Sequence, residues 1–328
     1  MAGPSGEDGI IAKYFAPIAG PGGLGLRDDA ALIAAPGGCE IVITKDALVA
    51  GVHFFADDAP AAIARKALRV NVSDLAAKGA NPLGFLLALA LPEDLPRGWI
   101  AKFARALGAD SSKFRIPLLG GDTVATPGPL MLSITALGSV PKGKMVPRTG
   151  ARAGDRLYVS GTIGDAAIGL YRRSGDALAR DIDARSAAHL VSRYLEPQPR
   201  LALAPALRAF ASGAMDISDG LVGDLRKMLG ASGVSGRVEL ARIPFSNAAL
   251  KACRTQDKFH DIALTGGDDY EILASVPPKR GAAFEKAAGE AGVRVTCIGF
   301  AAKGTRAPDF VDERGGARIF AKGSYSHF

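Results

Sequence analysis

The chain has 328 residues, of which 48% are hydrophobic and 22% charged, a composition that excludes a disordered protein and allows two domains of ordinary size. No apolar run reaches the about 18 residues that a membrane span needs, and no basic segment precedes an apolar one near the N-terminus, so we expect neither a membrane span nor a secretory signal. The net charge of +7 comes from scattered Lys and Arg residues, which argues against a nucleic-acid-binding platform and suits small anionic substrates.

Apolar periodicity predicts alternating elements in the first half of the chain. These are a short helix capped by Asp8, strands at 40–44, 83–91, 116–119 and 130–137, and helices at 60–79 and 99–107. The stretch from Val140 to Asp155 is rich in Pro, Gly and basic residues and breaks this pattern. We therefore place a boundary at Arg148–Gly150, which gives an N-terminal domain at 1–149 and a C-terminal domain at 150–328.

The second half shows a similar mixture. It predicts strands at 156–160, 214–217 and 270–276, a helix at 165–172, and a helix at 218–229 that is capped by Ser218 and stopped by Gly230. Because strands and helices mix in both halves without strict alternation, the fold class is predicted to be α+β with two domains. The cysteines at 39, 253 and 297 form no CxxC pair, which favours a reducing compartment over a disulfide framework or a zinc site.

Acidic residues recur beside glycines or at the ends of predicted strands, where loops meet and ligands bind. They are Asp28, Asp29, Asp46, Asp74, Asp122, Asp216, Asp219, Asp268 and Asp269. Hard oxygen ligands from several loops, with almost no Cys or His among them, describe a magnesium site. Magnesium that is held by Asp and bridges phosphates is typical of nucleotide phosphoryl transfer.

Two of these carboxylates, and one histidine, also have plainer interpretations, which the sequence leaves open. Asp74 and Lys78 are four residues apart on a helix and could form a surface ion pair. Asp219 could do no more than favour the N-terminus of a helix. His53 could be a core or turn histidine.

Two glycine-rich segments are candidate phosphate loops. The segment 20–25 matches GxGxxG, but no clear strand precedes it and no helix follows, so it does not indicate a dinucleotide fold. The segment "YVSGTIGDAAIGL" can bind phosphate through backbone amides or can pack two elements closely. No GxxxxGK[ST] motif is present, which excludes a P-loop kinase.

The acidic motifs occur in the order found in the thiamine-monophosphate kinase family, a PurM-like branch of the aminoimidazole-ribonucleotide-synthetase superfamily. The segments that carry this resemblance are "GLRDDAAL", "TKDALVAGVHF", "NVSDLAAKGANP", "GGDT", "RTGARAGDRLYVSGTIGDAAIGL", "AMDISDGLVGDL", "GGDDYEI" and the closing "SYSHF". The resemblance runs from about Gly6 to the C-terminus, which is nearly the whole chain.

The resemblance implies a cytoplasmic enzyme that makes thiamine diphosphate and ADP by moving the γ-phosphoryl group of ATP onto thiamine monophosphate, in line and with several Mg²⁺ ions. It implies a two-domain PurM-like fold, in which the N-terminal domain binds ATP and magnesium and the C-terminal domain completes the active site. It also implies a homodimer, whose N-terminal sheets join into a barrel, and no nucleic-acid or membrane partner.

The matching motifs assign the family's site residues to positions in this chain. Magnesium would be held by Asp29, Thr44, Asp46, Asp74, Asp122, Asp216 and Asp219. ATP would contact Gly121, Asp122, Arg148 and Ser218, and thiamine monophosphate would contact His53, Asp268 and Tyr325. No nucleophile or general base is expected, because the acceptor is already an ionised phosphate.

The chemistry agrees with this assignment. Two like unit charges 4 Å apart repel by roughly 4 kcal/mol at an effective dielectric constant near 20, and magnesium ions offset this repulsion between two phosphorylated substrates.

The chain departs from the family pattern at three positions. Lys45 replaces a small residue, Asp268 replaces Glu, and Tyr325 replaces Trp. On a strand Lys45 would point away from Thr44 and Asp46.

Two other functions remain open. Another ATP-dependent synthetase of the same superfamily is one, although Cys39 lies too far beyond the glycine loop for a selenophosphate synthetase, and a C-terminal cysteine, expected in hydrogenase maturation, is replaced by Phe328. The net positive charge leaves a non-catalytic nucleic-acid-binding protein as the other.

Overall fold

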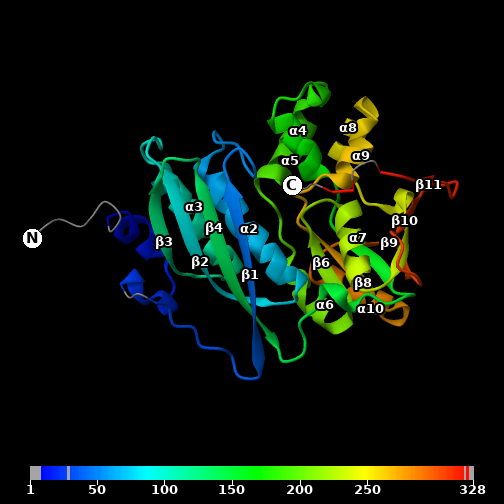
Figure 1. Ribbon diagram of the computed structural model, residues 1–328, viewed down its shortest axis with the longest axis horizontal. Coiled ribbons are helices and arrows are strands. Elements are labelled where there is room, and N and C mark those ends of the chain that lie inside the picture. The colour runs from blue at the N-terminus through cyan, green and yellow to red at the C-terminus, as the bar shows by residue number, and fades with distance from the viewer. Residues whose placement is uncertain (1–8, 28–29, 321–322, 325–328) are drawn as a thin grey trace, which may run out of the picture. The chain divides into compact units, whose positions relative to one another are not determined.

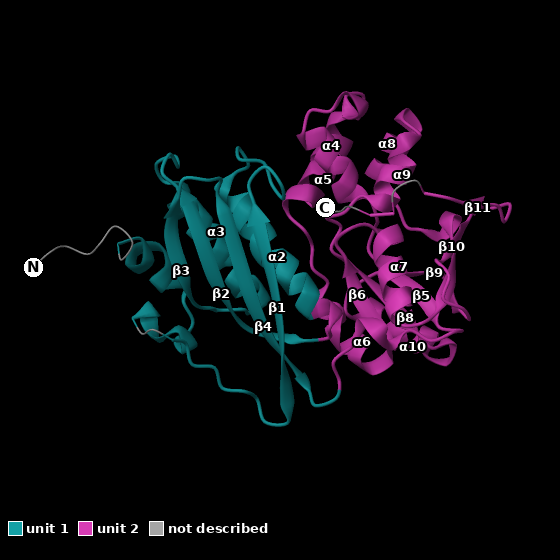
Figure 2. Ribbon diagram, in the orientation of Figure 1, with its two compact units in different colours: residues 1–75, 80–143 teal, residues 76–79, 144–328 magenta. Residues whose placement is uncertain are grey.

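The computed structural model describes residues 9–27, 30–320 and 323–324 (Figure 1). These residues form two compact units, one made of residues 1–75 and 80–143 and the other of residues 76–79 and 144–328 (Figure 2). Within the described part of the chain, no helix combines the length and the apolar character that crossing a membrane requires.

Unit 1 is a four-stranded mixed sheet with helices on one side (Figure 1). The strands are β1 (Cys39–Val49), β2 (Asn81–Pro92), β3 (Leu118–Thr126) and β4 (Met131–Pro141), in the order β1-β4-β2-β3. The β2–β3 pair is parallel and the other two pairs are antiparallel. The helices are α2 (Pro60–Ala77) and α3 (Trp99–Phe114), and short turns η1 (Ile11–Phe15), η2 (Ala16–Ile18) and η3 (Pro21–Leu26) precede the sheet.

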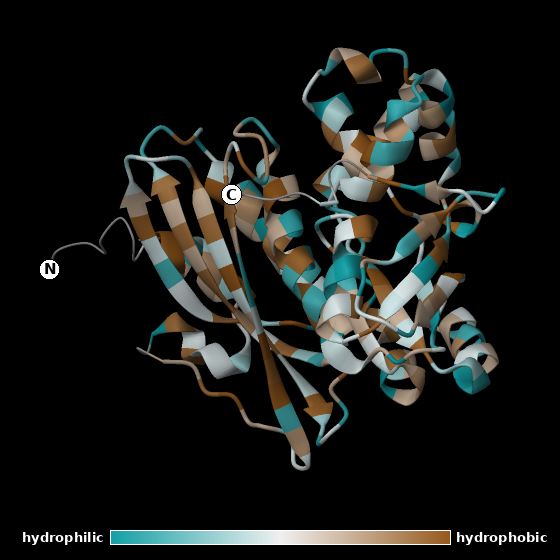
Figure 3. Cartoon of the chain, turned by 45° about the vertical axis from the view of Figure 1, so that its right-hand side comes forward, coloured by the Kyte–Doolittle hydropathy of each residue, from teal (hydrophilic) through white to brown (hydrophobic). Residues whose placement is uncertain are grey.

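Hydrophobic residues recur along the strands of this sheet, and alternation decides which face each one takes (Figure 3). Phe85, Leu87 and Leu89 of β2 are buried, whereas Leu86 between them is exposed. The sheet therefore has one covered face and one open face. The open face also carries exposed Ile43 of β1.

Helix α2 ends where the sequence predicts. Gly79 has a φ of +69°, a left-handed conformation that glycine adopts without strain, and the Ala80 amide donates to the Leu75 carbonyl at 2.8 Å.

An ion pair holds α2 and α3 together in the covered layer. Arg69 donates to the two carboxylate oxygens of Asp110 at 2.5 and 3.1 Å, and each side chain is only 5% exposed. The fork of the guanidinium matches both carboxylate oxygens, so neither buried charge is left unpaired.

Unit 2 is built on a seven-stranded sheet in the order β11-β10-β7-β9-β5-β8-β6. Its strands are β5 (Arg156–Ser160), β6 (Gly213–Ile217), β7 (Ser235–Glu239), β8 (Glu271–Val276), β9 (Val295–Ala302), β10 (Asp309–Val311) and β11 (Ala317–Arg318). Its helices are α4 (Asp165–Arg173), α5 (Ala184–Leu195), α6 (Ala204–Phe210), α7 (Leu221–Ala231), α8 (Asn247–Thr255), α9 (Lys258–Thr265) and α10 (Gly281–Glu290).

Three hydrophobic clusters organise unit 2. Helix α7 packs on one face of the sheet, and its Leu225 and Met228 belong to the same hydrophobic cluster as Leu273 of β8. Helices α6 and α10 pack on the other face, where Phe284 meets Tyr158 edge to face. The third cluster joins α4, α5, α8 and α9 to one another.

The α+β prediction is confirmed, with differences at element boundaries. The helix expected at 218–229 begins at Leu221, with Gly220 as its N-cap, so the prediction that Ser218 caps it is wrong. The Ser218 carbonyl instead accepts a hydrogen bond from the Asp268 amide, which draws the residue into a turn. The strand expected at 116–119 starts at Leu118 and continues to Thr126, because it pairs with β2 along this length.

The Arg69–Asp110 pair yields a stability prediction. Asp110→Ala removes the carboxylate that neutralises a buried guanidinium and should lower the free energy of unfolding of unit 1 by about 3–5 kcal/mol. Trp99, the single tryptophan of the chain, stacks on Phe103 in α3, so its fluorescence reports urea unfolding of this unit. The double variant Arg69→Met/Asp110→Leu is the control and should recover most of the loss. An unchanged midpoint for Asp110→Ala would contradict the prediction.

Candidate functional site

The covered face of the unit 1 sheet brings three predicted metal ligands together. Thr44 and Asp46 lie two residues apart on β1 and so share one face, and Asp74 projects from α2 towards them. The Thr44 hydroxyl donates a hydrogen bond to Asp74 Oδ2. Asp74 therefore contacts the sheet, whereas Lys78 donates to the Ala214 carbonyl at 2.8 Å.

The two carboxylates of this cluster repel each other. Burial, and in second place the charge of Asp74, raise the pKa of Asp46 to about 6. Ionised Asp46 therefore opposes folding near neutral pH, unless a cation approaches both carboxylates.

These three side chains fit a magnesium ion whose coordination shell is completed by other oxygen atoms. Two carboxylates and a hydroxyl are hard ligands, which magnesium prefers. Among the described residues, no group of three or more His, Cys, Asp or Glu side chains is placed to hold a metal. Magnesium sites usually combine one or two carboxylates with substrate phosphates and water.

The open face of the same sheet carries Lys45 and Asp122, which the sequence analysis also singled out. Lys45 points away from Thr44 and Asp46, as strand alternation predicts, and it lines a cavity of about 700 Å³. Gly121 and Asp122 of β3 line the same cavity. In the sheet, Asp122 pairs with Ala88 of β2, whose neighbours Leu87 and Leu89 face the helices, so Asp122 lies on the face opposite Asp46.

His53 lies in the turn that follows β1. The Val49 amide donates to its Nδ1 atom at 3.1 Å, so the neutral ring carries its proton on Nε2. This bond orients the ring in the turn that precedes α2.

In unit 2, the end of β6 carries the predicted Asp216, and the turn that leads to α7 carries Ser218 and Asp219. Asp216 is 7% exposed in β6, and Ser218 and Asp219 are half-buried. The Asp219 amide donates to Asp224 Oδ2 at 2.9 Å, and Lys227 donates to the carboxylates of both Asp219 and Asp224.

Asp224 is the buried support of this turn. It is fully buried, and this burial raises its pKa, while the Asp219 amide and Lys227 act in the opposite direction. The sequence shows this support only as an acid and a lysine three residues apart on a helix.

The loop that leads into β8 has a strained backbone. Asp268 has a φ of +71° and Tyr270 a φ of +50°, conformations that side chains other than glycine rarely adopt and that cost about 1–3 kcal/mol each. The amides of these two residues donate to the carbonyls of Ser218 and Ile217, both at 2.8 Å. The predicted acceptor ligand Asp268 is thus joined through the backbone to the turn that carries Asp216 and Asp219.

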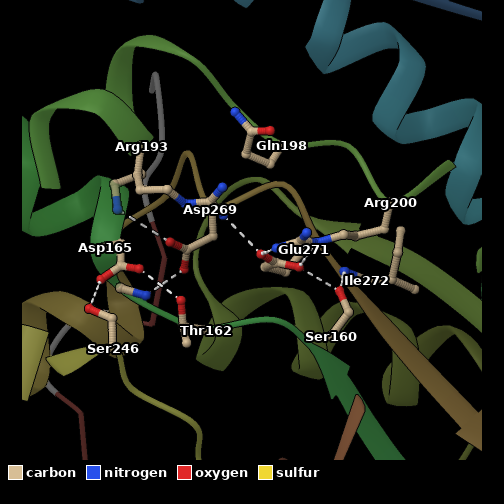
Figure 4. Close-up of polar contacts among 12 residues, drawn as sticks. Ser160, Thr162, Asp165, Arg193, Gln198, Arg200, Ser246, Asp269, Glu271 and Ile272 are labelled. Carbon is tan, nitrogen blue, oxygen red and sulfur yellow. Dashed lines mark hydrogen bonds and ion pairs between the residues drawn. The ribbon is translucent and has the colours of Figure 1, made fainter. Parts of the chain in front are cut away.

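Between and after the strained residues lie two buried carboxylates (Figure 4). Asp269 accepts from the amides of Gly164 and Ala166 at 2.8 and 3.4 Å, at the N-terminus of α4. Burial raises the pKa of Asp269 well above its usual value, and the Gly164 amide counters this. Glu271 is held by Arg193, Arg200 and Ser160.

These contacts decide between the two interpretations of "YVSGTIGDAAIGL". The α4 amides bind the chain's own Asp269. A Cβ atom on Gly161 would lie 2.2 Å from Glu271 Oε1, and one on Gly164 would lie 2.2 Å from Ala263 Cβ. The glycines of this segment therefore permit close packing, and a phosphate role is not needed to explain them.

Three predicted residues remain to be placed. Arg148 is exposed in the turn η4 (Arg148–Gly150) of unit 2, where its carbonyl accepts from Ser232 Oγ at 3.3 Å. Asp29 and Tyr325 lie outside the described residues. The structure thus groups Thr44, Asp46 and Asp74 in one unit, and it groups Asp216, Ser218, Asp219 and Asp268 in the other.

Several polar residues of unit 2 were not singled out by the sequence patterns. They are Asp165, Arg193, Arg200, Asp224, Lys227 and Glu271. For Glu271 the available signal was the acidic run Asp268-Asp269-Tyr270-Glu271 at the start of a strand, since its two arginines lie 78 and 71 residues away in the chain.

Comparisons with known proteins agree on one family. Residues 27–140 match the model of the AIR synthase related protein, N-terminal domain, and residues 152–307 match that of the C-terminal domain. Over 303 residues the chain is 45% identical to the thiamine-monophosphate kinase of Caulobacter vibrioides, covering 91% of this chain and 84% of the relative. The chain belongs to the thiamine-monophosphate kinase family.

Solved structures of this family are similar over most of their length. The crystal structure of the thiamine-monophosphate kinase from Stenotrophomonas maltophilia K279a has a TM-score of 0.80 and 38% identity, covering 89% of this chain and 91% of that one. The structure "AaThiL complexed with AMPPCP and TMP" has a TM-score of 0.79 and 30% identity, covering 92% of this chain and 91% of that one. Both similarities support the two-domain PurM-like fold.

The repulsion between Asp46 and Asp74 gives a prediction for the metal-free protein. Asp46→Asn removes one of the two charges, so the thermal midpoint of unit 1 in EDTA should rise by about 2–4 °C, as expected for relief of about 1 kcal/mol. Excess magnesium should raise the midpoint of the wild type and leave that of the variant nearly unchanged. Trp99 fluorescence measures both effects.

Asp94→Asn, which removes an exposed carboxylate of the same unit, is the matched control. It should change neither the midpoint in EDTA nor the response to magnesium. A lower midpoint for Asp46→Asn, or an unaltered magnesium response, would contradict the assignment of this residue to a cation site.

Proposed function

We propose that the chain is a magnesium-dependent thiamine-monophosphate kinase, which transfers the γ-phosphoryl group of ATP in line onto thiamine monophosphate and forms thiamine diphosphate and ADP. The observation that carries this proposal is the 45% identity to a thiamine-monophosphate kinase over 91% of the chain. The solved relative in complex with AMPPCP and TMP supports the assignment of both substrates.

In this proposal, acidic residues of both units serve the metal. Thr44, Asp46 and Asp74 would hold magnesium on the covered face of the unit 1 sheet, and Asp122 would hold it separately on the opposite face. Asp29 would be a further ligand, and Asp216 and Asp219 would hold magnesium in unit 2. Several Mg²⁺ ions, when bound, supply positive charge that offsets the repulsion between the two phosphorylated substrates.

The remaining residues bind and orient the substrates. Gly121, Asp122, Arg148 and Ser218 would contact ATP, and His53, Asp268 and Tyr325 would contact thiamine monophosphate. The Val49 amide fixes the His53 ring, and the Ser218 carbonyl fixes the Asp268 backbone, so both acceptor contacts are held before the substrate arrives. No residue has to remove a proton, because the attacking oxygen belongs to an ionised phosphate.

We also propose a homodimer formed through the open face of the unit 1 sheet. Large apolar side chains are exposed on its four strands, namely Ile41, Ile43, Leu86, Val124 and Met131. Apolar side chains gathered on one face favour contact with another protein surface. Sedimentation of the purified chain distinguishes a dimer from a monomer.

A cytoplasmic location is part of the same proposal. All three cysteines are free thiols, as expected in a reducing compartment. ATP, the proposed phosphoryl donor, is a cytoplasmic metabolite.

The direct test of the function is a product assay. The purified chain is incubated with ATP, thiamine monophosphate and Mg²⁺, and thiamine diphosphate is separated by chromatography. We expect thiamine diphosphate and ADP in equal amounts, and no product when EDTA removes the metal. A folded chain that binds ATP and magnesium but forms no thiamine diphosphate would contradict the proposal and favour a synthetase of the same superfamily.

Two variants test the assignment of the metal ligands. Loss of a residue that only supports a metal ligand typically lowers activity by about 10–100-fold. Asp46→Asn and Asp219→Asn each remove a proposed ligand itself, so each should lower turnover by a larger factor. Asp94→Asn is again the control and should retain wild-type turnover. Retention of most of the turnover by either variant would remove that residue from the metal site.

A further inference from the structure

Glu271 is a fully buried carboxylate with an unusually complete set of donors (Figure 4). Ser160 Oγ and Arg200 Nε donate to its Oε2 atom, both at 2.6 Å. Arg193 Nη2 donates to Oε1 at 2.8 Å, and Arg200 Nη2 donates to the same oxygen. A buried charge is retained at low cost only when it is paired in this way.

These contacts join segments that lie far apart in the chain. Arg193 belongs to α5, Arg200 follows that helix, and Ser160 ends β5. The Ser160 hydroxyl also accepts a hydrogen bond from the Ile272 amide at 2.8 Å. The backbone at the start of β8 is therefore fixed from three sides.

In residues 268–271, a strained backbone alternates with a side chain that is held by hydrogen bonds. Asp268 and Tyr270 have left-handed backbones, whereas Asp269 is bound by the α4 amides and Glu271 by the two arginines. Strained backbone persists only where its surroundings over-determine it. The two carboxylates supply this constraint, one between the strained residues and one directly after them.

We infer that Glu271, through its ion pairs with Arg193 and Arg200, is a positioning residue that holds the loop 266–270 in the conformation that presents Asp268 to thiamine monophosphate. This inference rests on the proposed function, which assigns Asp268 to thiamine monophosphate. Glu271 itself touches neither substrate in this scheme.

The effect should fall on the acceptor more than on ATP. The turn that carries Ser218 and Asp219 has a support of its own, because Asp224 and Lys227 bind it from α7. Loss of the Glu271 charge would release the loop at Asp268 while this second support still holds the turn.

The test is Glu271→Gln, which keeps the shape of the side chain but removes its charge. We expect the KM for thiamine monophosphate to rise about 10-fold or more, with the KM for ATP changed by less than about twofold. We also expect faster amide hydrogen exchange in the metal-free, substrate-free protein, confined to peptides that cover residues 264–271.

A purely structural role is excluded by a matched control. Ile298→Val trims a buried side chain of β9 in the same sheet and should destabilise unit 2 without altering either KM. Equal increases in both KM values for Glu271→Gln, or the same acceptor effect in Ile298→Val, would overturn the inference. Unchanged hydrogen exchange at 264–271 would also overturn it.

Two further outcomes are covered by the design. If Glu271→Gln does not fold, Arg193→Gln is used instead, because it removes a single donor from the same carboxylate. A higher KM for thiamine monophosphate with a nearly unchanged KM for ATP would then support the inference, and equal changes in both would overturn it. If the wild type forms no thiamine diphosphate, the proposed function fails, and hydrogen exchange alone decides whether Glu271 holds the loop.

Discussion

The constraint on which both candidate regions depend is the placement of carboxylates close together in buried or partly buried positions. Like charges in such surroundings repel strongly, and each must be neutralised, protonated or paired. In unit 2 the chain supplies its own partners, since two arginines bind Glu271 and two backbone amides bind Asp269. In unit 1, Asp46 and Asp74 lie close together beside the Thr44 hydroxyl, and burial, with the charge of Asp74 in second place, raises the pKa of Asp46 to about 6.

This difference separates structural carboxylates from those available for function. The paired acids fix the backbone, and the strained residues Asp268 and Tyr270 are retained because of them. The unit 1 pair resembles a site that waits for a cation brought with phosphate, because magnesium commonly completes its shell with substrate oxygens. The proposed magnesium site would explain why a carboxylate that destabilises the metal-free protein is retained at position 46.

The sequence predicted the elements whose signals are local. The periodicity of the helix at 60–79, its glycine stop and the alternation that separates Lys45 from Asp46 all follow from spacing along the chain. The start of α7 was misplaced because Ser218, a good capping residue, is drawn into a contact with Asp268 some 50 residues later, which no local pattern reveals. The Glu271 network was missed for the same reason, since its arginines come from α5 and the segment after it. The position of Asp122 on the opposite face from Asp46 required the pairing of β2 with β3.

The measurement that tests this account most directly is amide hydrogen exchange across the whole chain, with and without excess Mg²⁺ and in the absence of nucleotide. If Asp46 and Asp74 bind a cation, whereas Asp269 and Glu271 are held by amides and arginines of the chain itself, magnesium should slow exchange in β1 and α2 and leave the start of β8 unchanged. Equal protection of both regions, or no change in β1 and α2, would contradict the claim that Asp46 and Asp74 bind a cation whereas Asp269 and Glu271 do not.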